Sequence, residues 1–292
     1  MHKRLHSIFA VAASVAATML AVACSTDDYA IDKGSSEVTP VEPSRPLTLD
    51  VEPITVPGTE VTFDMILVRR GSFVMGGADA DAPEHLVTLT KDFYIGRTEV
   101  TQSLYQAVMD ANPSSFNYDG SYPVENVSFE DANTFCQKLS RLTGYHFTLP
   151  TEAQWEYAAY GGSHGSHTRY SGGDNISQVG WYVGNAPIYQ VYNTETMRYD
   201  TIRHTMAVAQ KQHNLLGLYD MMGNVREWCA DAWGPLSADD ATDPLCTNGG
   251  ERVYRGGSCN DSAQYCRAAH REAITPASKG FSIGFRLAIN ME

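Results

Sequence analysis

The sequence lacks the short motifs by which several large enzyme classes are identified. It has no phosphate-binding P-loop, no glycine-rich dinucleotide fingerprint and no His-Glu-x-x-His zinc motif, which argues against nucleotide-dependent and zinc-peptidase chemistry. A serine-nucleophile pattern occurs at residues 161–165 (GGSHG), but a predicted helix precedes Ser163 where the nucleophile elbow requires a strand, so Ser163 is expected in a loop. The nine histidines do not cluster at metal-ligand spacing. We expect these to be surface or hydrogen-bonded residues: His85, His146, His213 and His270.

Basic residues are also scarce. The chain has 21 lysines and arginines against 34 aspartates and glutamates, which gives a formal net charge of −13. Removal of a leader that contains Lys3 and Arg4 makes the remainder more negative still. A surface of this sign repels nucleic acid and anionic lipid head groups, so neither is expected as a partner, and it favours cations as ligands.

The N-terminus has the pattern of an export signal. Lys3 and Arg4 precede an apolar run at residues 8–23, which is shorter than the roughly 20 residues of a membrane-spanning helix. Residues 1–23 are therefore predicted to be a signal peptide, with a transmembrane anchor as the alternative. Cys24 follows Ala-Val-Ala and resembles the lipid-modified cysteine of bacterial lipoproteins. The acidic residues after it resemble the tag that some lipoproteins use to reach the outer membrane and its outer surface, so membrane contact is expected only through lipid on Cys24.

Two further segments follow the predicted lipid site. Residues 24–60 are rich in proline, serine, threonine and acidic residues, a composition that predicts a flexible tether. Residues 61–291 are long enough for a substantial core and show no internal repeat, so they are predicted to form one domain.

Hydrophobic patterning in this domain predicts helices and strands together. Helices are expected after Thr101, over residues 128–144, and after Thr151. Two of them begin with capping-box patterns, Ser128 with Asp131 and Thr151 with Gln154. Strands or hairpins are expected at residues 61–77, 85–101, 252–257, 264–270 and 284–289, with long ordered loops over 165–250. The mixture predicts an α+β fold with much irregular backbone.

Four segments in this order resemble the formylglycine-generating enzyme family, also called the sulfatase-modifying factor family. They are FYIGRTEVTQSLYQAVM, residues 123–162 with LPTEAQWEYAAYGG, NLLGLYDMMGNVREWCADAW, and RVYRGGSCND with CRAAHRE and GFSIGFRLA. The resemblance runs from about Phe63 to Ile289. It implies a loop-rich variant of the C-type-lectin-like fold.

The resemblance also implies a calcium-binding turn at GNVREW. Gly223, Asn224, Val225 and Glu227 would supply carbonyl, amide and carboxylate oxygens, which are the ligands that calcium prefers. In the alternative reading, Asn224 only shapes the turn and Glu227 pairs with a buried arginine, Arg255 or Arg286.

A neighbouring group of residues is read as structural. Glu152, Trp155 and Glu156 look like functional carboxylates around an aromatic ring. Carboxylates on a capped helix commonly hold arginines in place, so these are expected to bind the arginines of RGGS and GFRLA.

Active members of the family hold Cu(I) between two cysteines after the GGS turn, because this ion selects soft thiolates. Here the first of those positions holds Asp261 and not a cysteine, so the pair is not in place. Cys259 and Cys266 would be catalytic only as a displaced copper-binding pair. A disulfide among the cysteines other than Cys136 is another possible fate, and Cys136 is expected in the core.

Two functions follow from these alternatives. The first is a non-catalytic binding domain whose C-terminal loops, CNDSAQY and EAITPASKGFS, recognise an unknown protein, peptide or glycan. The second is a copper- and oxygen-dependent oxidase that converts a sulfatase cysteine to formylglycine. The missing cysteine pair favours the first.

Overall fold

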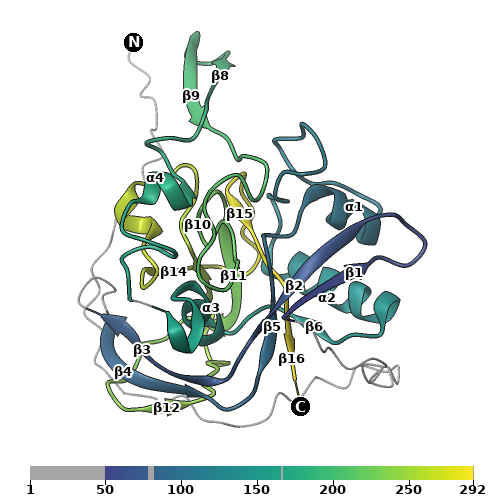
Figure 1. The fold of residues 1–292 in the computed structure, drawn as a ribbon. Helices are drawn as coiled ribbons and strands as arrows, with labels where there is room; N and C mark the ends of the chain where they lie inside the picture. Colours follow the sequence, from purple (N-terminus) through teal and green to yellow (C-terminus); the bar gives the residue numbers. More distant parts are fainter. Residues whose placement is uncertain (1–49, 78–81, 166, 292) are drawn as a thin grey trace.

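The computed structural model describes residues 50–77, 82–165 and 167–291. The predicted signal peptide, Cys24 and most of the predicted tether lie outside these residues. The described part of the chain contains four α-helices, two 3-10 helices and sixteen strands, joined by long irregular segments (Figure 1). This confirms the predicted α+β class. No helix in these residues is both long and apolar enough to cross a bilayer.

A five-stranded sheet in the order β1-β2-β5-β16-β6 runs through the molecule. Its strands are β1 (Val51–Thr55), β2 (Thr62–Val68), β5 (Phe93–Gly96), β16 (Ala288–Asn290) and β6 (Phe147–Thr148). β1 pairs antiparallel with β2, and Ile54 and Val56 are buried. The folded part therefore begins near residue 51, and the prediction of a tether up to residue 60 is wrong for its last ten residues. The polar composition of residues 51–60 hides the alternation of the strand within them. Pro53 is tolerated there because β1 is an edge strand.

This sheet is buried on both faces. In β2, Met65 and Leu67 belong to one hydrophobic core, whereas Ile66 and Val68 belong to a second, as the alternation of side chains along a strand dictates. The same two strands, β2 and β5, therefore contribute to both cores.

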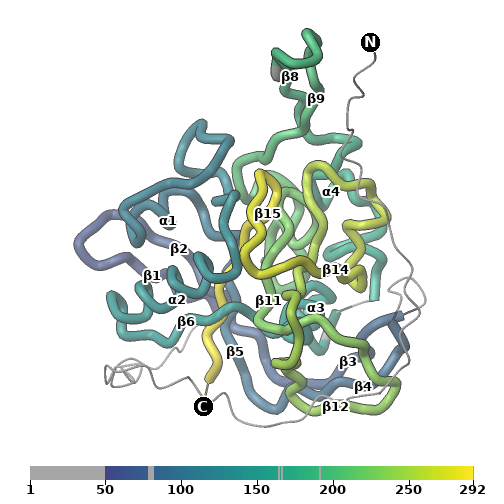
Figure 2. Tube along the Cα trace, turned by 180° about the vertical axis from the view of Figure 1, so that it is seen from behind, coloured from purple at the N-terminus to yellow at the C-terminus, as the bar shows by residue number. Residues whose placement is uncertain are grey.

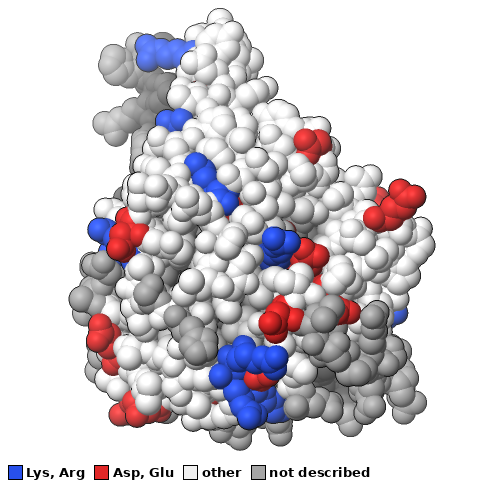
Figure 3. All heavy atoms as spheres, viewed as in Figure 1, with Lys and Arg blue, Asp and Glu red and all other residues white. Residues whose placement is uncertain are grey.

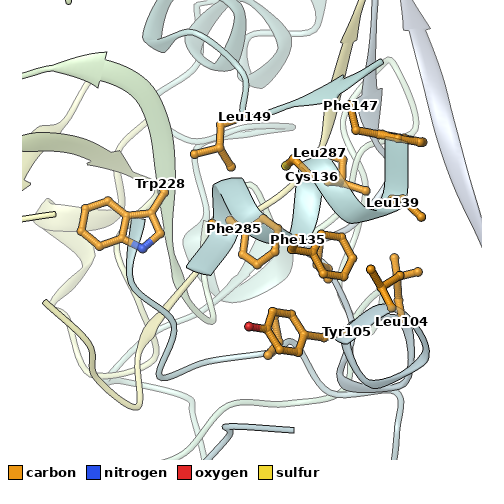
Figure 4. Packing of buried hydrophobic residues seen from close by; sticks show 14 of the residues in the cluster. Leu104, Tyr105, Phe135, Cys136, Leu139, Phe147, Leu149, Trp228, Phe285 and Leu287 are labelled. Atoms are coloured by element: carbon orange, nitrogen blue, oxygen red, sulfur yellow. The ribbon is translucent and has the colours of Figure 1, made fainter. Parts of the chain in front are cut away.

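The first core joins the sheet to α1 (Gln102–Met109) and α2 (Phe129–Thr143). Figure 4 shows its aromatic centre, where Tyr105 stacks on Phe135 with ring centroids 5.3 Å apart and Phe285 meets Phe135 edge-on. The capping box of Ser128 and Asp131 forms as predicted. Near the end of α2, Leu139 is fully buried but Leu142 is 45% exposed, so the packed face of α2 ends before its last turn.

The second core contains α3 (Glu152–Ala159), which also begins with its predicted capping box. Around α3 lie a three-stranded and a four-stranded sheet. The three-stranded sheet consists of β12 (Ala241–Thr242), β4 (Ala82–Leu89) and β3 (Gly71–Gly77). The four-stranded sheet consists of β14 (Arg271–Ile274), β13 (Arg252–Arg255), β11 (Arg226–Ala232) and β15 (Ile283–Gly284). Smaller elements are the parallel pair β7 (Gly180–Trp181) and β10 (Met222–Gly223), the helix α4 (Ile176–Val179), and the 3-10 helices η1 (Gly162–His164) and η2 (Ala263–Cys266).

Two strand predictions need correction. Residues 61–77 form two strands, β2 and β3, but these belong to different sheets and do not pair with each other. Residues 264–270 form no strand. The chain turns on itself there, because Tyr265 N–H donates to Ser262 and His270 N–H donates to Arg267 instead of to a neighbouring strand.

One element stands apart from both cores. The strands β8 (Ile188–Asn193) and β9 (Arg198–Arg203) form a two-stranded hairpin that projects from the body, as seen from both sides in Figures 1 and 2. Charged residues of both signs are scattered over the face shown in Figure 3, and the projecting end is mostly uncharged.

Candidate functional site

The GNVREW turn places Glu227 in the interior, at the start of β11. Its carboxylate accepts hydrogen bonds from Arg286, with Nε 2.5 Å from Oε2 and Nη2 2.6 Å from Oε1. Trp155 Nε1 donates to the same Oε2 at 2.7 Å. Glu227 and Arg286 are both fully buried. The structure thus realises the alternative in which Glu227 pairs with a buried arginine, and Arg286 is the partner.

The other residues assigned to calcium shape the turn. Asn224 has a left-handed φ of 56°, accepts the Met206 N–H at Oδ1, and donates through Nδ2 to Glu99. Val225 N–H donates to the second oxygen of Glu99 at 3.1 Å. Gly223 also has a positive φ, and a Cβ there would lie 1.9 Å from the carbonyl oxygen of Trp181.

These donors do not fit a calcium ion. Calcium takes six to eight oxygen ligands, and its carboxylates balance the charge of the ion. The charge of Glu227 is already matched by Arg286, and the Asn224 oxygen is used by the backbone. In the described part of the chain, no group of three or more His, Cys, Asp or Glu residues is arranged to hold a metal ion.

Two more carboxyl groups lie close to this pair. Burial raises the pKa of Glu99 well above its usual value, and the nearby Asp220 and Glu227 raise it further. Burial also raises the pKa of Asp220 to about 6. One Asp220 oxygen accepts the Ala209 N–H, while the other has no hydrogen-bond partner among the described residues. Arg286 therefore faces three buried carboxyl groups, and Lys211 also acts on Asp220, so carboxyl groups outnumber the cations, which favours protonation of some of them.

A second buried network confirms that the carboxylates of α3 are structural. Glu152 accepts hydrogen bonds from Arg255 and Arg271, and Glu156 accepts one from Arg255. Burial raises the pKa of Glu152, but the two arginines more than offset this, so its pKa lies below the usual value. The prediction was correct for Arg255. Arg286 of GFRLA is held instead by Glu227.

The cysteines do not pair. Cys136, Cys229, Cys246, Cys259 and Cys266 are free, and all but Cys246 are buried. Burial raises the pKa of the Cys259 thiol and raises that of Cys266 to about 12. The Cys266 thiol faces the Ser258 carbonyl at 3.9 Å, and the Cys259 sulfur accepts from Asn260 at 3.2 Å. No disulfide forms among the described residues.

Asp261 lies beside these thiols and is held by an ion pair and a hydrogen bond. Arg226 Nη2 is 2.5 Å from Asp261 Oδ1, and Ser258 Oγ donates to Oδ2 at 2.7 Å. The Asp261 carboxylate is a hard ligand and is already matched by Arg226 and Ser258. This position therefore does not fit Cu(I), which selects soft thiolates.

The remaining predictions concern single residues. Ser163 lies in η1, directly after α3, so no nucleophile elbow forms. Three of the four named histidines are surface or hydrogen-bonded, as expected, whereas the buried Nε2 of His270 has no hydrogen-bond partner among the described residues. His85 Nδ1 is 3.1 Å from the Pro83 carbonyl, His213 Nδ1 is 2.7 Å from the Asn214 carbonyl, and His146 is exposed.

An open cleft of about 830 Å³ lies at the outer edge of the four-stranded sheet. Its lining includes Trp233, Glu251, Tyr265, His270, Arg271 and Glu272. The rings of Trp233 and Tyr265 are 37% and 39% exposed. Each predicted recognition loop supplies part of this lining, Tyr265 from CNDSAQY and Glu272 from EAITPASKGFS. Sequence reasoning missed Trp233 and Glu251, because only the fold brings them beside these loops.

Charge and aromatic contacts give the cleft a defined chemistry. The Arg271 guanidinium stacks over Trp233 at 4.2 Å, but its charge is neutralised by Glu152. The nearby His270 lowers the pKa of Glu272, whose carboxylate lies 3.7 Å from His270 Nε2. Glu272, which also lies 4.0 Å from Arg226, and the exposed Glu251 are the acidic groups of this lining.

Comparisons with known proteins agree with this geometry. Residues 55–291 match the family described as sulfatase-modifying factor enzyme 1-like domain. The chain is 35% identical over 207 residues to the chaperone protein LppX of Paenibacillus barcinonensis, covering 59% of this chain and 72% of that protein. It is 36% identical over 176 residues to the formylglycine-generating enzyme of Streptomyces coelicolor, covering 58% of this chain and 52% of that enzyme, so it spans about half the enzyme's length.

A solved structure shares the fold over nearly the whole described region. Treponema denticola variable protein 1 superposes with a TM-score of 0.72 and 31% identity, covering 84% of this chain and all of that one. The chain therefore belongs to the sulfatase-modifying factor family, whose members include the formylglycine-generating enzymes.

Proposed function

We propose that this chain is a non-catalytic binding domain of the cell envelope. The observation that carries the proposal is the Arg226–Asp261 ion pair. Where the family resemblance implies a copper-binding thiolate, this chain has a carboxylate matched to an arginine and to Ser258. The nearby Cys259 and Cys266 are buried, and their sulfurs contact the Asn260 side chain and the Ser258 carbonyl respectively. Oxygen chemistry at Cu(I) therefore has no suitable ligand pair.

The competing function is copper-dependent formylglycine formation, which the identity to the Streptomyces coelicolor enzyme favours. The two are separated by titrating the reduced protein with Cu(I), alongside Cys259→Ser and Cys266→Ser. We expect no stoichiometric site in any of the three proteins. A sulfatase-type peptide incubated with copper, oxygen and the protein should keep its cysteine by mass spectrometry. One equivalent of tightly bound copper that either serine variant loses, together with an aldehyde product, would make the chain an oxidase.

The binding site that the geometry supports is the cleft around Trp233 and Tyr265. Clefts that combine aromatic rings with a few polar groups are typical ligand sites, and aromatic residues are enriched where proteins bind partners. Because the lining presents the carboxylates of Glu251 and Glu272, and the Trp233 ring already stacks against the Arg271 guanidinium, we expect a ligand with ammonium or guanidinium groups, from a basic peptide or an amino-sugar glycan.

Calorimetry with hexalysine and hexaglutamate tests this charge preference, and chitosan oligomers test the glycan source. Hexalysine should bind and hexaglutamate should not, and Trp233→Ala should remove binding. Tyr199→Ala, which alters a more exposed aromatic residue on the projecting hairpin, should bind normally. Equal binding of both peptides, or unchanged binding by Trp233→Ala, would place the ligand elsewhere.

Attachment to the envelope belongs to the same proposal. Lipid on Cys24 would tether the domain to the outer membrane and leave its cleft in solution. The wild-type protein should partition into detergent, and Cys24→Ala should remain in the aqueous phase or unprocessed. Membrane attachment of Cys24→Ala at the wild-type level would exclude the lipid anchor.

A further inference from the structure

The β8–β9 hairpin exposes a large apolar surface, although a hairpin of two strands is only marginally stable on its own. In the described part of the chain its sheet contains only these two strands, and a lone two-stranded hairpin is marginally stable in water. The exposed fractions of its side chains are large: Met197 71%, Tyr199 63%, Ile188 55%, Tyr189 48% and Tyr192 46%. Contiguous apolar surface of this kind marks interaction sites.

Both faces of the hairpin take part. The register pairs Tyr192 with Tyr199, and their rings meet edge-on with centroids 5.1 Å apart. Tyr189 lies opposite Ile202 and points to the other face, because side chains alternate along a strand. If the hairpin packed one face against the body, only the other face would be exposed. Here exposed tyrosines lie on both faces.

The aromatic surface continues at the foot of the hairpin. His204 follows β9 directly, and its ring lies 5.3 Å from that of Tyr118 and 5.7 Å from that of Phe116. Phe116 in turn meets Phe281 edge-on at 5.8 Å. Tyr118 is 51% exposed and Phe281 is 39% exposed. Together with the hairpin they form one surface, which we call the aromatic arm (residues 188–204 with Tyr118 and Phe281).

The charge of the arm favours a second copy of the chain as its partner. Its hairpin carries two acidic residues, Glu195 and Asp200, and two basic residues, Arg198 and Arg203, so its net charge is zero. The whole chain has a net charge of −13, which opposes the approach of two copies at most other places. Two arms can meet without that repulsion, and about 20 residues on each side is the size of a standard interface.

The two strand edges of the hairpin are not equivalent. At the foot of β9, Asn260 bonds both backbone groups of Arg203, accepting from its N–H at 3.2 Å and donating to its carbonyl at 3.3 Å. This side chain covers the last residue of the β9 edge. The β8 edge has no such cover among the described residues, and an open edge strand is a template for pairing with another chain.

We propose that two copies of this chain associate through their aromatic arms, with β8 of one pairing antiparallel with β8 of the other. The two hairpins then form a four-stranded sheet about a two-fold axis, in which the same surface of each copy meets itself. The added strands supply the partners that a two-stranded hairpin lacks. This inference rests on the hairpin alone and is independent of ligand binding at the cleft.

Sedimentation velocity of the full-length chain in detergent, from about 1 to 100 μM, tests association in the range of ordinary protein affinities. The protein should sediment with twice its monomer mass at the upper end of this range. Tyr192→Lys with Tyr199→Lys should be monomeric, because charges at the centre of the interface would face each other. Leu215→Lys is the control, since Leu215 is 72% exposed and lies outside the arm, and it should remain dimeric.

Cysteine cross-linking tests the chosen edge. Gln190 and Thr201 are exposed and lie opposite each other on β8 and β9. Gln190→Cys should form an intermolecular disulfide under mild oxidation, and Thr201→Cys should not. A chain that stays monomeric, a dimer that survives the two lysines with an unchanged melting temperature, or a cross-link through Thr201→Cys alone would overturn the proposal. Hairpin-dependent binding of a monomer to phosphatidylglycerol vesicles would also overturn it.

Discussion

At the scale of single residues, the interior is organised by arginines. Arg255 and Arg286 are both fully buried, and each is matched by carboxylates from distant parts of the sequence. Removing one partner of such a pair is far more damaging than the pair itself is stabilising, because the remaining charge stays buried and unmatched. The residues that look like a catalytic or metal site are therefore the ones on which folding depends.

Glu227→Gln tests this reading. Replacing the carboxylate leaves Arg286 buried without its counter-charge, so we expect a loss of about 3–5 kcal/mol in the free energy of unfolding. Urea denaturation with and without a calcium chelator measures it, and the loss should be the same in both. The exposed Glu251→Gln should change stability by less than about 0.5 kcal/mol. A chelator that destabilises the wild-type protein but not Glu227→Gln would restore calcium to the turn.

A second residue-scale prediction concerns pH. Burial raises the pKa of Glu125 to about 7, and one of its oxygens has no hydrogen-bond partner among the described residues. The folded state keeps this proton up to about pH 7, whereas the unfolded chain releases it near 4.5. The unfolded state thus binds fewer protons in this window, so stability falls as the pH rises from about 4.5 to 7. Burial also raises the pKa of Asp231, to about 7, and that of Asp220. Both groups therefore lower the stability as the pH rises, as Glu125 does.

The melting temperature should therefore be higher at pH 6 than at pH 8. Glu125→Gln, which imitates the protonated form, should narrow this difference and raise the melting temperature at pH 8. Glu130→Gln, at an exposed position on α2, should leave the difference unchanged. A melting temperature that rises between pH 6 and 8 would show that other titrating groups dominate.

At the scale of secondary-structure elements, the backbones of the parallel pair β7 and β10 are in close contact. Gly223→Ala would place a Cβ 1.9 Å from the Trp181 carbonyl oxygen, in addition to the strain of a left-handed φ. Gly217 has a similar φ, but a Cβ added there would have no atom within 4 Å. We expect Gly217→Ala to cost about 1–2 kcal/mol and Gly223→Ala to cost more, measured by chemical denaturation. Equal losses would mean that β7 and β10 move apart freely.

Elements with local signals were predictable from the sequence, and those that depend on long-range contacts were not. The caps of α2 and α3 are set by residues three positions apart, so Ser128 and Thr151 identified them. The polar composition of β1 predicts a tether, because the pairing with β2 that makes it a strand is not visible in its own residues. The pattern of residues 264–270 predicts a strand, because Cys266 and Ala268 imitate alternation while the backbone turns. In the site, the family motif located Glu227, but only the fold identified Arg286 as its partner.

At the scale of the whole molecule, the two cores should unfold together. They share β2 and β5, whose alternate side chains enter opposite cores, so loss of one core removes support from the other. The buried thiols report this directly, since Cys136 belongs to the first core and Cys229 to the second.

Pulsed thiol labelling along a urea gradient, read by mass spectrometry, measures each cysteine separately. Cys246, the only one of the described cysteines that is not buried, should react in the native state. Cys136 and Cys229 should become reactive at the same urea concentration. Labelling of Cys136 well before Cys229 would mean that the cores are separate folding units.

The position of β16 has a consequence for how the protein is made. This strand lies between β5 and β6, yet the ribosome synthesises it long after both. Until residues 288–290 emerge, the two earlier strands lack their common neighbour, and the first core lacks Phe285, Leu287 and Ile289. Folding during synthesis is thereby postponed, which keeps the nascent chain in the unfolded form that a secretion channel requires. If the chain is exported as its N-terminus predicts, the sheet closes only after translocation.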